Sequence, residues 1–277
     1  MTKACVIGWP IEHSRSPIIH GYWLKKYGID GSYEKRAVAP DDAEAFLRNL
    51  EQEGLAGCNV TVPLKEIAFA VADHRDPSAL AVKAANTIWI ENGKIHAANT
   101  DTYGFMTHLG LEAPGWQNPD KPVVLLGGGG AARAICHGFL EAGVSEIIIL
   151  NRTKERAEKL ADDFQDRGNV RAGDWVDRTR CCEWASVIVN TTTLGMKGEG
   201  DLEIDFFSAD PDCVVCDIVY VPLETKLLAE ARRYGLKTVD GLGMLLHQAV
   251  PGFERWFGVR PEVTPELRQL VLDDIGA

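Results

Sequence analysis

A run of four glycines directly after a short apolar segment constrains the fold more than any other feature of the sequence. Val123 to Leu126 has the composition of a buried strand, and Gly127 to Gly130 follows it without a gap. Ala131 to Ala142 then has the pattern of a helix that closes at Gly143. A glycine turn between a strand and a helix directs free backbone N–H groups and the positive helix end toward one point, which favours a bound phosphate.

The glycine spacing also fits a dinucleotide-binding turn. Gly127, Gly129 and the small residue Ala132 match the pattern G-x-G-x-x-[GA], in which larger side chains would hold the pyrophosphate away from the backbone. Four consecutive glycines satisfy many patterns, so the match depends on the strand before it and the helix after it. A purely structural turn is the alternative, and we favour the dinucleotide site. The predicted cofactor contacts here are Gly127, Gly128, Gly129, Gly130 and Ala131.

The end of the next predicted strand indicates which dinucleotide binds. Ile147 to Leu150 runs into Asn151-Arg152-Thr153, without the Asp or Glu that accepts ribose hydrogen bonds in NAD-binding units. Arg152 can pair with the 2′-phosphate of NADP, and Thr153 and Arg156 are further donors. A solvated helix start is the alternative, but cations there oppose the helix dipole. We therefore predict NADP, with Asn151, Arg152, Thr153 and Arg156 beside it.

The rest of the chain predicts an α/β fold with two domains. Its 277 residues exceed one average domain. In the first hundred residues, short β-like runs alternate with helical ones, which favours a mostly parallel sheet flanked by helices. There we predict a helix over Asp41 to Glu53 that ends at Gly54, and a hairpin about the Asn-Gly turn between Thr87 and Ala97.

Three prolines between residues 111 and 122 mark a joint between the predicted domains. A regular series of strands and helices follows, with a predicted helix over Lys154 to Gln165. We predict a substrate domain over 1–102, an inserted NADP-binding Rossmann domain over 103–241, and helices over 242–277 that return to the substrate domain. Substrate and cofactor are expected to meet between the domains.

Charge and hydropathy exclude several classes of partner. The formal net charge is −11, whereas proteins that bind nucleic acid or anionic membranes carry clustered Lys and Arg. No apolar run approaches the roughly 20 residues that span a bilayer. The apolar run near Met1 stops at Gly8 and Pro10, which does not fit a signal peptide. We therefore predict a cytoplasmic protein, a monomer or homodimer, that binds small molecules.

The cysteines and histidines do not predict a disulfide framework or a metal site. The seven cysteines are odd in number and scattered, which indicates free thiols. Cys213 and Cys216 have CxxC spacing, but they lie in an apolar run that predicts a buried strand, so we favour a core role over a redox role. The histidines have no HExxH or comparable spacing, and no metal is predicted.

Three polar clusters in the first hundred residues follow predicted strands, where α/β sheets present their ligand sites. His13 to Pro17 offers two serine hydroxyls at a helix start, which suits a carboxylate, although this segment alone slightly favours a capping serine. Asn59 to Lys65 is the second cluster, and Asn86-Thr87 with Asn99 to Asp101 forms the third. A Lys and an Asp brought together would transfer a proton, and a surface Lys with a capping Asp is the alternative.

Motifs along nearly the whole chain resemble the shikimate dehydrogenase family. They are Gly8-x-Pro10-x-x-His13-Ser14-x-Ser16-Pro17-x-x-His20, Asn59-Val-Thr61-x-Pro63-x-Lys65, Asn86-Thr87, Asn99-Thr100-Asp101-x-x-Gly104, the glycine loop, Asn151-Arg152-Thr153, Asn190-x-Thr192-x-x-Gly195-Met196, Asp217-x-x-Tyr220-x-Pro222 and Gly241-Leu-Gly243-Met244-Leu245-x-x-Gln248. The family commonly has Ala where this chain has Gly128, and Gly-Ala-Val before the Asn-Thr pair where this chain has Lys83-Ala84-Ala85.

The resemblance implies an NADPH-dependent, reversible reduction of 3-dehydroshikimate to shikimate, a step toward chorismate and the aromatic amino acids. It implies that Ser14 and Ser16 hold the substrate carboxylate and that Lys65 with Asp101 carries the proton transfer. The remaining implied substrate contacts are Asn59, Thr61, Asn86, Tyr220 and Gln248, and the implied cofactor contacts include Ile218 and Gly241. A quinate dehydrogenase that uses NAD and a non-catalytic NADP sensor are the alternatives.

Overall fold

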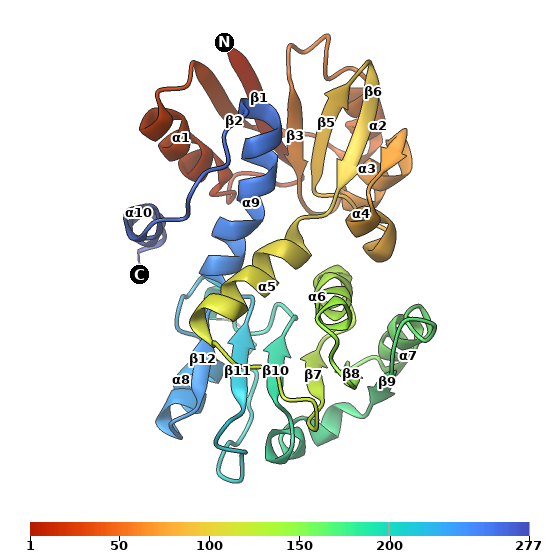
Figure 1. Ribbon diagram of the computed structural model, residues 1–277, viewed down its shortest axis with the longest axis vertical. Helices are drawn as coiled ribbons and strands as arrows, with labels where there is room; N and C mark the ends of the chain where they lie inside the picture. Colours follow the sequence, from red (N-terminus) through yellow and green to blue (C-terminus); the bar gives the residue numbers. More distant parts are fainter. Residues whose placement is uncertain (199, 277) are drawn as a thin grey trace. The chain divides into compact units, whose positions relative to one another are not determined.

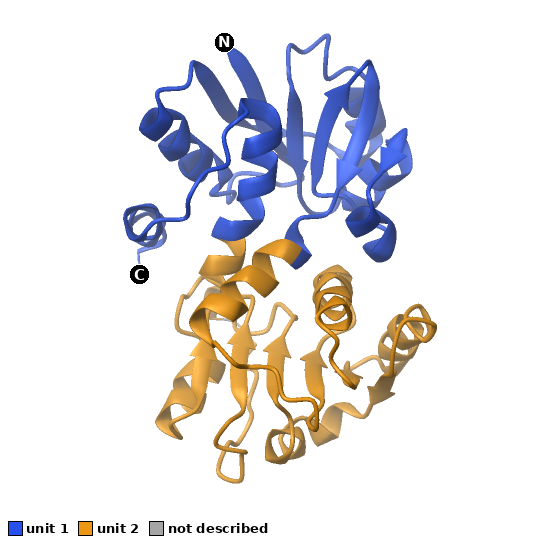
Figure 2. Ribbon diagram, in the orientation of Figure 1, with its two compact units in different colours: residues 1–102, 246–276 blue, residues 103–245, 277 orange. Residues whose placement is uncertain are grey.

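The computed structural model describes residues 1–198 and 200–276, which divide into two compact units (Figure 2). Unit 1 comprises residues 1–102 and 246–276, and unit 2 comprises residues 103–245. The chain re-enters unit 1 along helix α9 (Leu242–Phe257). Residue 277, the last residue of the predicted C-terminal segment, lies outside the described residues.

Unit 1 contains a six-stranded sheet of order β2-β1-β3-β5-β6-β4 (Figure 1). Strand β1 (Thr2–Gly8) pairs in parallel with β2 (Gly31–Ala37) and β3 (Gly57–Val60). The antiparallel strands β5 (Thr87–Glu91) and β6 (Lys94–Ala98) continue the sheet. The sheet is therefore mixed, because the hairpin interrupts the parallel order.

The predicted hairpin between β5 and β6 is confirmed. Its two turn residues, Asn92 and Gly93, have φ angles of 53° and 69°, as a two-residue hairpin turn with positive φ at both positions requires. The short strand β4 (His74–Arg75) pairs with β6 in parallel at the sheet edge.

One helix of unit 1 ends earlier than predicted. Helix α2 (Pro40–Arg48) ends at Arg48, so the predicted continuation to Glu53 is wrong. The chain turns instead, and the Leu55 N–H donates to the Leu50 carbonyl at 2.9 Å while Leu50 is fully buried. The other helices of this unit are α1 (Ser16–Tyr27), α3 (Lys65–Val71), α4 (Pro77–Val82) and α10 (Pro265–Ile275).

Unit 2 contains a parallel sheet of order β12-β11-β10-β7-β8-β9. Its strands are β7 (Val123–Leu126), β8 (Ile147–Leu150), β9 (Val170–Gly173), β10 (Val187–Asn190), β11 (Val214–Asp217) and β12 (Lys237–Val239). The chain builds outward from β7 on one side and then returns to add β10 on the other. This is the doubly wound Rossmann order, in which ligands bind at the carboxyl ends of the strands where the order reverses. The predicted fold class is therefore confirmed.

The helices of unit 2 cover both faces of this sheet. They are α5 (Asp101–Glu112), whose first two residues belong to unit 1, α6 (Gly130–Glu141), α7 (Lys154–Asp162) and α8 (Lys226–Arg233). Short 3₁₀ turns lie at Trp175–Arg178, Arg180–Glu183 and Met196–Gly198. Helix α7 ends at Asp162, short of the predicted Gln165.

The core of unit 2 lies on both faces of its sheet, because side chains alternate along each buried strand. Val123 and Leu125 pack into one apolar cluster and Val124 and Leu126 into the other. Cys216 packs into the first of these clusters and Cys213 into the second. The two thiols of the CxxC spacing therefore lie on opposite faces of the sheet. All seven cysteines are buried and free.

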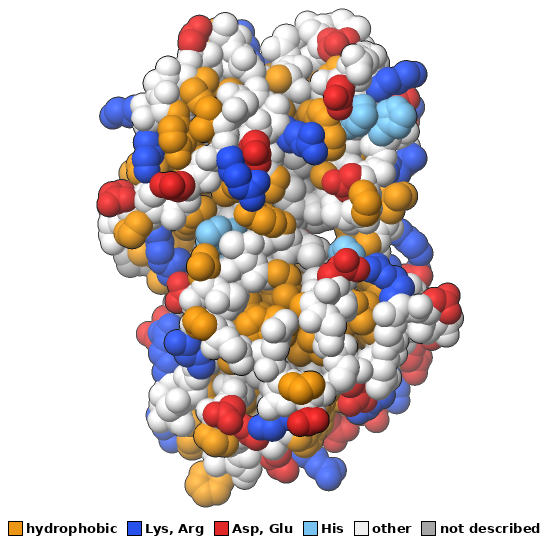
Figure 3. Space-filling view, in the orientation of Figure 1, with side chains coloured by type: hydrophobic (Ala, Val, Ile, Leu, Met, Phe, Trp, Pro, Cys, Tyr) orange, Lys and Arg blue, Asp and Glu red, His pale blue; other side chains and the backbone are white. Residues whose placement is uncertain are grey.

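The surface shown in Figure 3 mixes acidic and basic side chains without a continuous basic patch. Among residues 1–198 and 200–276, no helix has the length and apolar character needed to cross a bilayer.

Candidate active site

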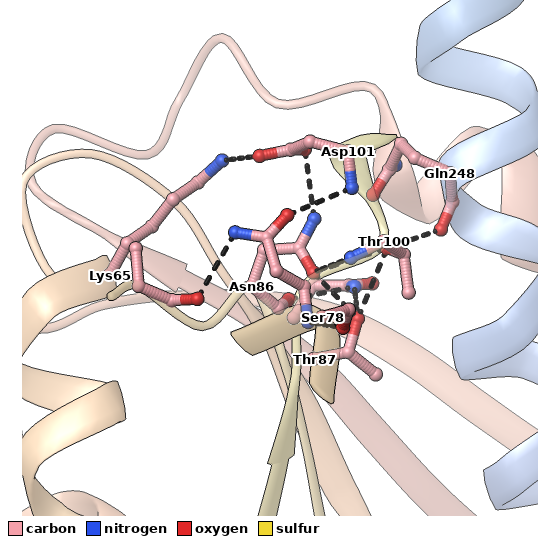
Figure 4. Close-up of polar contacts among 10 residues, drawn as sticks. Lys65, Ser78, Asn86, Thr87, Thr100, Asp101 and Gln248 are labelled. Atoms are coloured by element: carbon pink, nitrogen blue, oxygen red, sulfur yellow. Dashed lines mark hydrogen bonds and ion pairs between the residues drawn. The ribbon is translucent and has the colours of Figure 1, made fainter. Parts of the chain in front are cut away.

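Lys65 and Asp101 meet at one end of the sheet of unit 1 (Figure 4). Lys65 is the first residue of α3, which follows β3, and Asp101 is the first residue of α5, which follows β6. The Lys65 Nζ lies 2.5 Å from Asp101 Oδ2, and their side chains are 28% and 14% exposed. A carboxylate at a helix N-terminus is favoured by the helix dipole. The ion pair is therefore partly shielded from water but still open to a small molecule.

A buried asparagine orients the Asp101 carboxylate. The Asn86 Nδ2 donates to Asp101 Oδ1 at 2.9 Å, which leaves Oδ2 to Lys65. The Asn86 Oδ1 accepts from the Thr100 N–H at 2.8 Å and from the Thr87 hydroxyl at 3.0 Å. Asn86 is 2% exposed, and both ends of its amide are satisfied, so its orientation is fixed.

Two serines and a glutamine are also predicted to bind the substrate in unit 1. Ser14 and Ser16 stand at the start of α1 with their hydroxyl oxygens 3.3 Å apart. The N-cap residue of α1 is Arg15, which makes no side-chain capping bond, so the serines are not the N-cap residue of this helix. Gln248 lies on α9 beside Asp101 in Figure 4, and its backbone carbonyl accepts from the Thr100 hydroxyl at 2.8 Å.

The side chains of Thr61 and Asn59 differ in solvent exposure and in hydrogen bonding. A Cβ on Gly8 would lie 2.6 Å from Thr61 Cγ2, so the Thr61 methyl packs where only glycine fits. Thr61 is half-buried and its hydroxyl makes no hydrogen bond within the described part of the chain. Asn59 is 5% exposed, and both ends of its amide bond to the protein. Thr61 therefore has a free polar group to offer, whereas the polar groups of Asn59 are already engaged.

The first two glycines of the loop in unit 2 have close neighbours, and the first also has a positive φ. Gly127 has a φ of 121°, and a Cβ there would lie 2.5 Å from the Thr191 hydroxyl oxygen. A Cβ on Gly128 would lie 3.2 Å from the Arg156 backbone, closer than ordinary van der Waals contact. An alanine at this position would therefore require a small shift of helix α7, which gives a physical reason for the glycine at position 128.

The next two glycines have the opposite surroundings. A Cβ on Gly129 or Gly130 would meet no protein atom within 4 Å. Helix α6 begins at Gly130, and Gly129 at its N-cap has no side chain with which to cap it. Ala131 follows in the first turn and is half-buried. Uncapped N–H groups and open space at a helix start provide room for a pyrophosphate close to the backbone.

Two unpaired arginines lie beside this loop. The Gly128 N–H donates to Asn151 Oδ1 at 3.1 Å, and Asn151 Nδ2 donates to the Thr153 carbonyl at 2.7 Å, which ties the loop to the end of β8. Arg152 and Arg156 are exposed, and neither guanidinium has a hydrogen bond or ion pair with any residue that the structure describes. In a chain of net charge −11, two free cations beside a phosphate cradle fit a 2′-phosphate.

The backbone of Gly241 lies close to that of Ile218, the residue that follows β11. A Cβ on Gly241 would lie 2.7 Å from the Val219 carbonyl oxygen and nearer still to that of Ile218, so only glycine allows this approach. The half-buried Tyr220 follows in the same segment, and it belongs to unit 2, whereas the other predicted substrate residues belong to unit 1.

Asp217 anchors this segment, a role that sequence reasoning missed. Its Oδ1 accepts from the Asn190 amide and from the Val219 N–H, both at 2.9 Å, and its Oδ2 accepts from the Thr225 hydroxyl at 2.8 Å. Burial raises the pKa of Asp217 to about 6, and these hydrogen bonds oppose the rise. The signal in the sequence was an acidic residue at the end of an otherwise apolar strand.

Within the described residues, no group of three or more His, Cys, Asp or Glu side chains is arranged to hold a metal ion.

The doubly wound unit, with its glycine cradle and free arginines, and the Lys–Asp pair of the other unit define a dinucleotide-binding α/β oxidoreductase.

Comparison with known families identifies the group to which it belongs. Three family models match: the shikimate dehydrogenase substrate binding domain at residues 6–88, shikimate / quinate 5-dehydrogenase at 114–194, and the shikimate 5′-dehydrogenase C-terminal domain at 241–270. A shikimate dehydrogenase (NADP(+)) of Brucella canis is 53% identical over 99% of this chain and 94% of its own length. The chain belongs to the shikimate dehydrogenase family.

Solved structures agree with this assignment. Shikimate 5-dehydrogenase from Thermus thermophilus, in complex with NADP(H) and shikimate, matches with a TM-score of 0.86 and 31% identity over 99% of this chain and 100% of that one. Quinate dehydrogenase from Corynebacterium glutamicum, in complex with NAD, matches with a TM-score of 0.90 and 28% identity over 98% of this chain and 99% of that one. The resemblance seen in the sequence motifs is confirmed.

Proposed function

We propose that this protein catalyses the reversible NADPH-dependent reduction of 3-dehydroshikimate to shikimate. The observation that carries the proposal is the Lys65–Asp101 pair, 2.5 Å apart and oriented by Asn86. The relative that is 53% identical over 99% of this chain is a shikimate dehydrogenase (NADP(+)), which supports both the substrate and the cofactor.

Lys65 transfers the proton in this reaction. NADPH, when bound, supplies the hydride that reduces the substrate ketone. Lys65 Nζ delivers a proton to the oxygen of that group, and in the reverse direction it accepts the proton from the hydroxyl. Asp101 Oδ2 holds Nζ in place. General acid–base help of this kind is worth about 10²- to 10⁴-fold in rate.

The remaining residues of unit 1 orient the substrate. The hydroxyls of Ser14 and Ser16 donate to its carboxylate, because their oxygens lie 3.3 Å apart and can contact one carboxylate together. The free hydroxyl of Thr61 and the side chains of Asn59, Asn86, Gln248 and Tyr220 contact the ring hydroxyls.

Unit 2 selects NADP over NAD. The backbone of Gly127 to Ala131 holds the pyrophosphate, and Ile218 with Gly241 borders the cofactor. Arg152 and Arg156 bind the 2′-phosphate with Asn151 and Thr153, since both guanidiniums are free of partners among the described residues. This argues against a quinate dehydrogenase that uses NAD, because NAD has no 2′-phosphate to pair with them.

We also propose the setting in which the enzyme works. Residues 1–102 with the helices over 242–277 form the substrate domain, and residues 103–241 form the NADP domain. The protein is cytoplasmic, a monomer or homodimer, with no nucleic-acid or membrane partner. Light scattering of the purified protein measures the number of chains, and fractionation of the cells measures the location.

Turnover of the purified protein tests the proposed function. With 3-dehydroshikimate and NADPH, the expected product is shikimate, identified by chromatography, in an amount equal to the NADPH consumed. Binding of NADPH without any product would contradict the proposal and would favour a non-catalytic NADP sensor.

A further inference from the structure

The C-terminal helix α10 packs on α1, the helix that begins at Ser16 (Figure 1). Two apolar side chains of α10, Leu267 and Val271, are fully buried. Near the start of α10, the hydroxyl oxygens of Thr264 and of Tyr22, on α1, lie 3.1 Å apart. Apolar packing and this polar contact therefore hold the first part of α10 on unit 1.

An ion pair joins the last turn of α10 to the start of α1. The Arg15 Nε lies 2.5 Å from Asp274 Oδ2, and the two side chains are 23% and 38% exposed. This Nε is buried and has no aligned hydrogen-bond partner among the described residues, so Asp274 supplies its countercharge. The Arg15 Nη1 also donates to the His13 carbonyl at 3.1 Å. One guanidinium therefore contacts both α10 and the serine turn, residues 13–16, which carries Ser14 and Ser16.

Both charges lie at helix ends that disfavour them. Arg15 is the N-cap residue of α1 and makes no side-chain capping bond, so its positive charge opposes the helix dipole. Asp274 lies in the last turn of α10, where a negative charge opposes the dipole as well. Neither residue suits its own helix, and the ion pair between the two helices accounts for both.

The position of Arg15 connects this ion pair to the predicted substrate site. Arg15 stands between two serines whose hydroxyl oxygens lie 3.3 Å apart. The Ser16 N–H donates to Ser14 Oγ at 3.4 Å, and the Arg15 carbonyl accepts from the Ile18 N–H at 3.0 Å in the first turn of α1. A shift of Arg15 would therefore move both serine hydroxyls.

We propose that Arg15 and Asp274 are positioning residues: through their ion pair, α10 holds the serine turn in the geometry that binds the substrate carboxylate. The inference rests on the proposed function, because it concerns the carboxylate end of the same substrate. It gives the C-terminal helix a part in substrate binding, although α10 carries none of the residues proposed to contact the substrate.

The first test is the Asp274→Asn variant, which removes the charge and keeps the size of the side chain. We expect the KM for shikimate to rise by about threefold to tenfold, the effect of a partly exposed charge that loses its partner. The kcat and the KM for NADP should stay within about twofold, because Lys65, Asp101 and the cofactor residues are untouched. Asp274→Glu keeps the charge and should restore most of the affinity.

Glu254→Gln is the matched control for this variant. It removes another ion pair of unit 1, in which Glu254 Oε2 lies 2.6 Å from Arg260 Nη1 and the glutamate side chain is 42% exposed. Its KM for shikimate should equal that of the wild type. A rise of the same size in the control would show that any lost ion pair of this unit weakens binding, and would overturn the inference.

A substrate without the carboxylate charge tests whether the ion pair acts on the serine turn. The ratio of kcat/KM for shikimate to that for its methyl ester should be smaller in Asp274→Asn than in the wild type. A second measurement is a double-mutant cycle with Ser14→Ala. In that background, Asp274→Asn should raise the KM for shikimate by less than about twofold, because the carboxylate contact is already weakened.

Several results would overturn the inference. These are an unchanged or lowered KM for shikimate in Asp274→Asn, an equal loss of kcat/KM for shikimate and its ester, or effects that multiply in the cycle with Ser14→Ala. A wild-type protein without turnover would remove the proposed function and this inference together. An active wild type with an unaffected Asp274→Asn variant would remove the inference alone.

Discussion

Replacement of Arg152 by alanine should weaken the binding of NADPH and leave the binding of NADH unchanged. The guanidinium is exposed and has no partner among the described residues, so its removal breaks no ion pair of the protein itself. The loss should therefore concern only the 2′-phosphate, which NADH lacks. The stability of unit 2 is expected to stay the same.

The magnitude follows from the exposure of this side chain. A hydrogen bond to a charged group contributes about 1.5–3 kcal/mol, which corresponds to roughly tenfold to more than a hundredfold in Kd. Because Arg152 is exposed, water and salt screen the pair, and we expect the lower part of that range, about tenfold at physiological ionic strength. The difference between variant and wild type should shrink as salt is added.

Fluorescence titration with NADPH and with NADH, at low and at high salt, measures this effect. Arg233→Ala is a suitable control, because Arg233 is an exposed arginine of the same unit that pairs with Glu230 at 3.4 Å on α8. The control should bind both cofactors as the wild type does. An Arg152→Ala variant that binds NADPH and NADH equally weakly, or that binds NADPH as tightly as the wild type, would contradict a role in binding the 2′-phosphate.

Three further predictions concern single residues. Lys65→Ala should lower kcat by about 10²- to 10⁴-fold and change KM little; a full kcat with a raised KM in steady-state assays would assign Lys65 to binding instead. Gly127→Ala should lower the melting temperature, since its φ of 121° and the Thr191 contact at 2.5 Å oppose a side chain, whereas Gly129→Ala should melt as the wild type does without NADP and bind NADP less tightly. The protonated Asp217 side chain should contribute to stability fully at acid pH, below the ordinary carboxyl range, and this contribution should be lost as the pH rises through about 6, the pKa to which burial raises this group. Between about pH 5 and about pH 8, the melting temperature should therefore fall less in Asp217→Asn than in the wild type. Equal falls in melting temperature would contradict this.

The features that could be predicted from the sequence depend on local pattern. The glycine loop, the strands beside it and the Asn92-Gly93 turn each require particular residues at adjacent positions, so the sequence alone identifies them. The end of α2 could not be predicted in this way. It depends on Leu50, which is fully buried by residues distant in the chain.

Contacts between distant segments explain what the sequence left open at the site. The spacing of Lys65 and Asp101 allowed a surface lysine and a capping aspartate, and only the folded sheet brings their polar atoms to 2.5 Å. Arg15 and Asp274 stand near opposite ends of the sequence. Their ion pair, with Nε and Oδ2 2.5 Å apart, joins two helices of the folded chain, and no local pattern indicates it.

Steady-state rates with shikimate and with quinate, each measured with NADP and with NAD, show directly whether the protein is a shikimate dehydrogenase that selects NADP. The four combinations examine the reaction, the ring specificity and the recognition of the 2′-phosphate together. We predict the highest kcat/KM for shikimate with NADP, a lower value when NAD replaces NADP, and little activity with quinate. A highest kcat/KM for quinate with NAD would contradict this prediction.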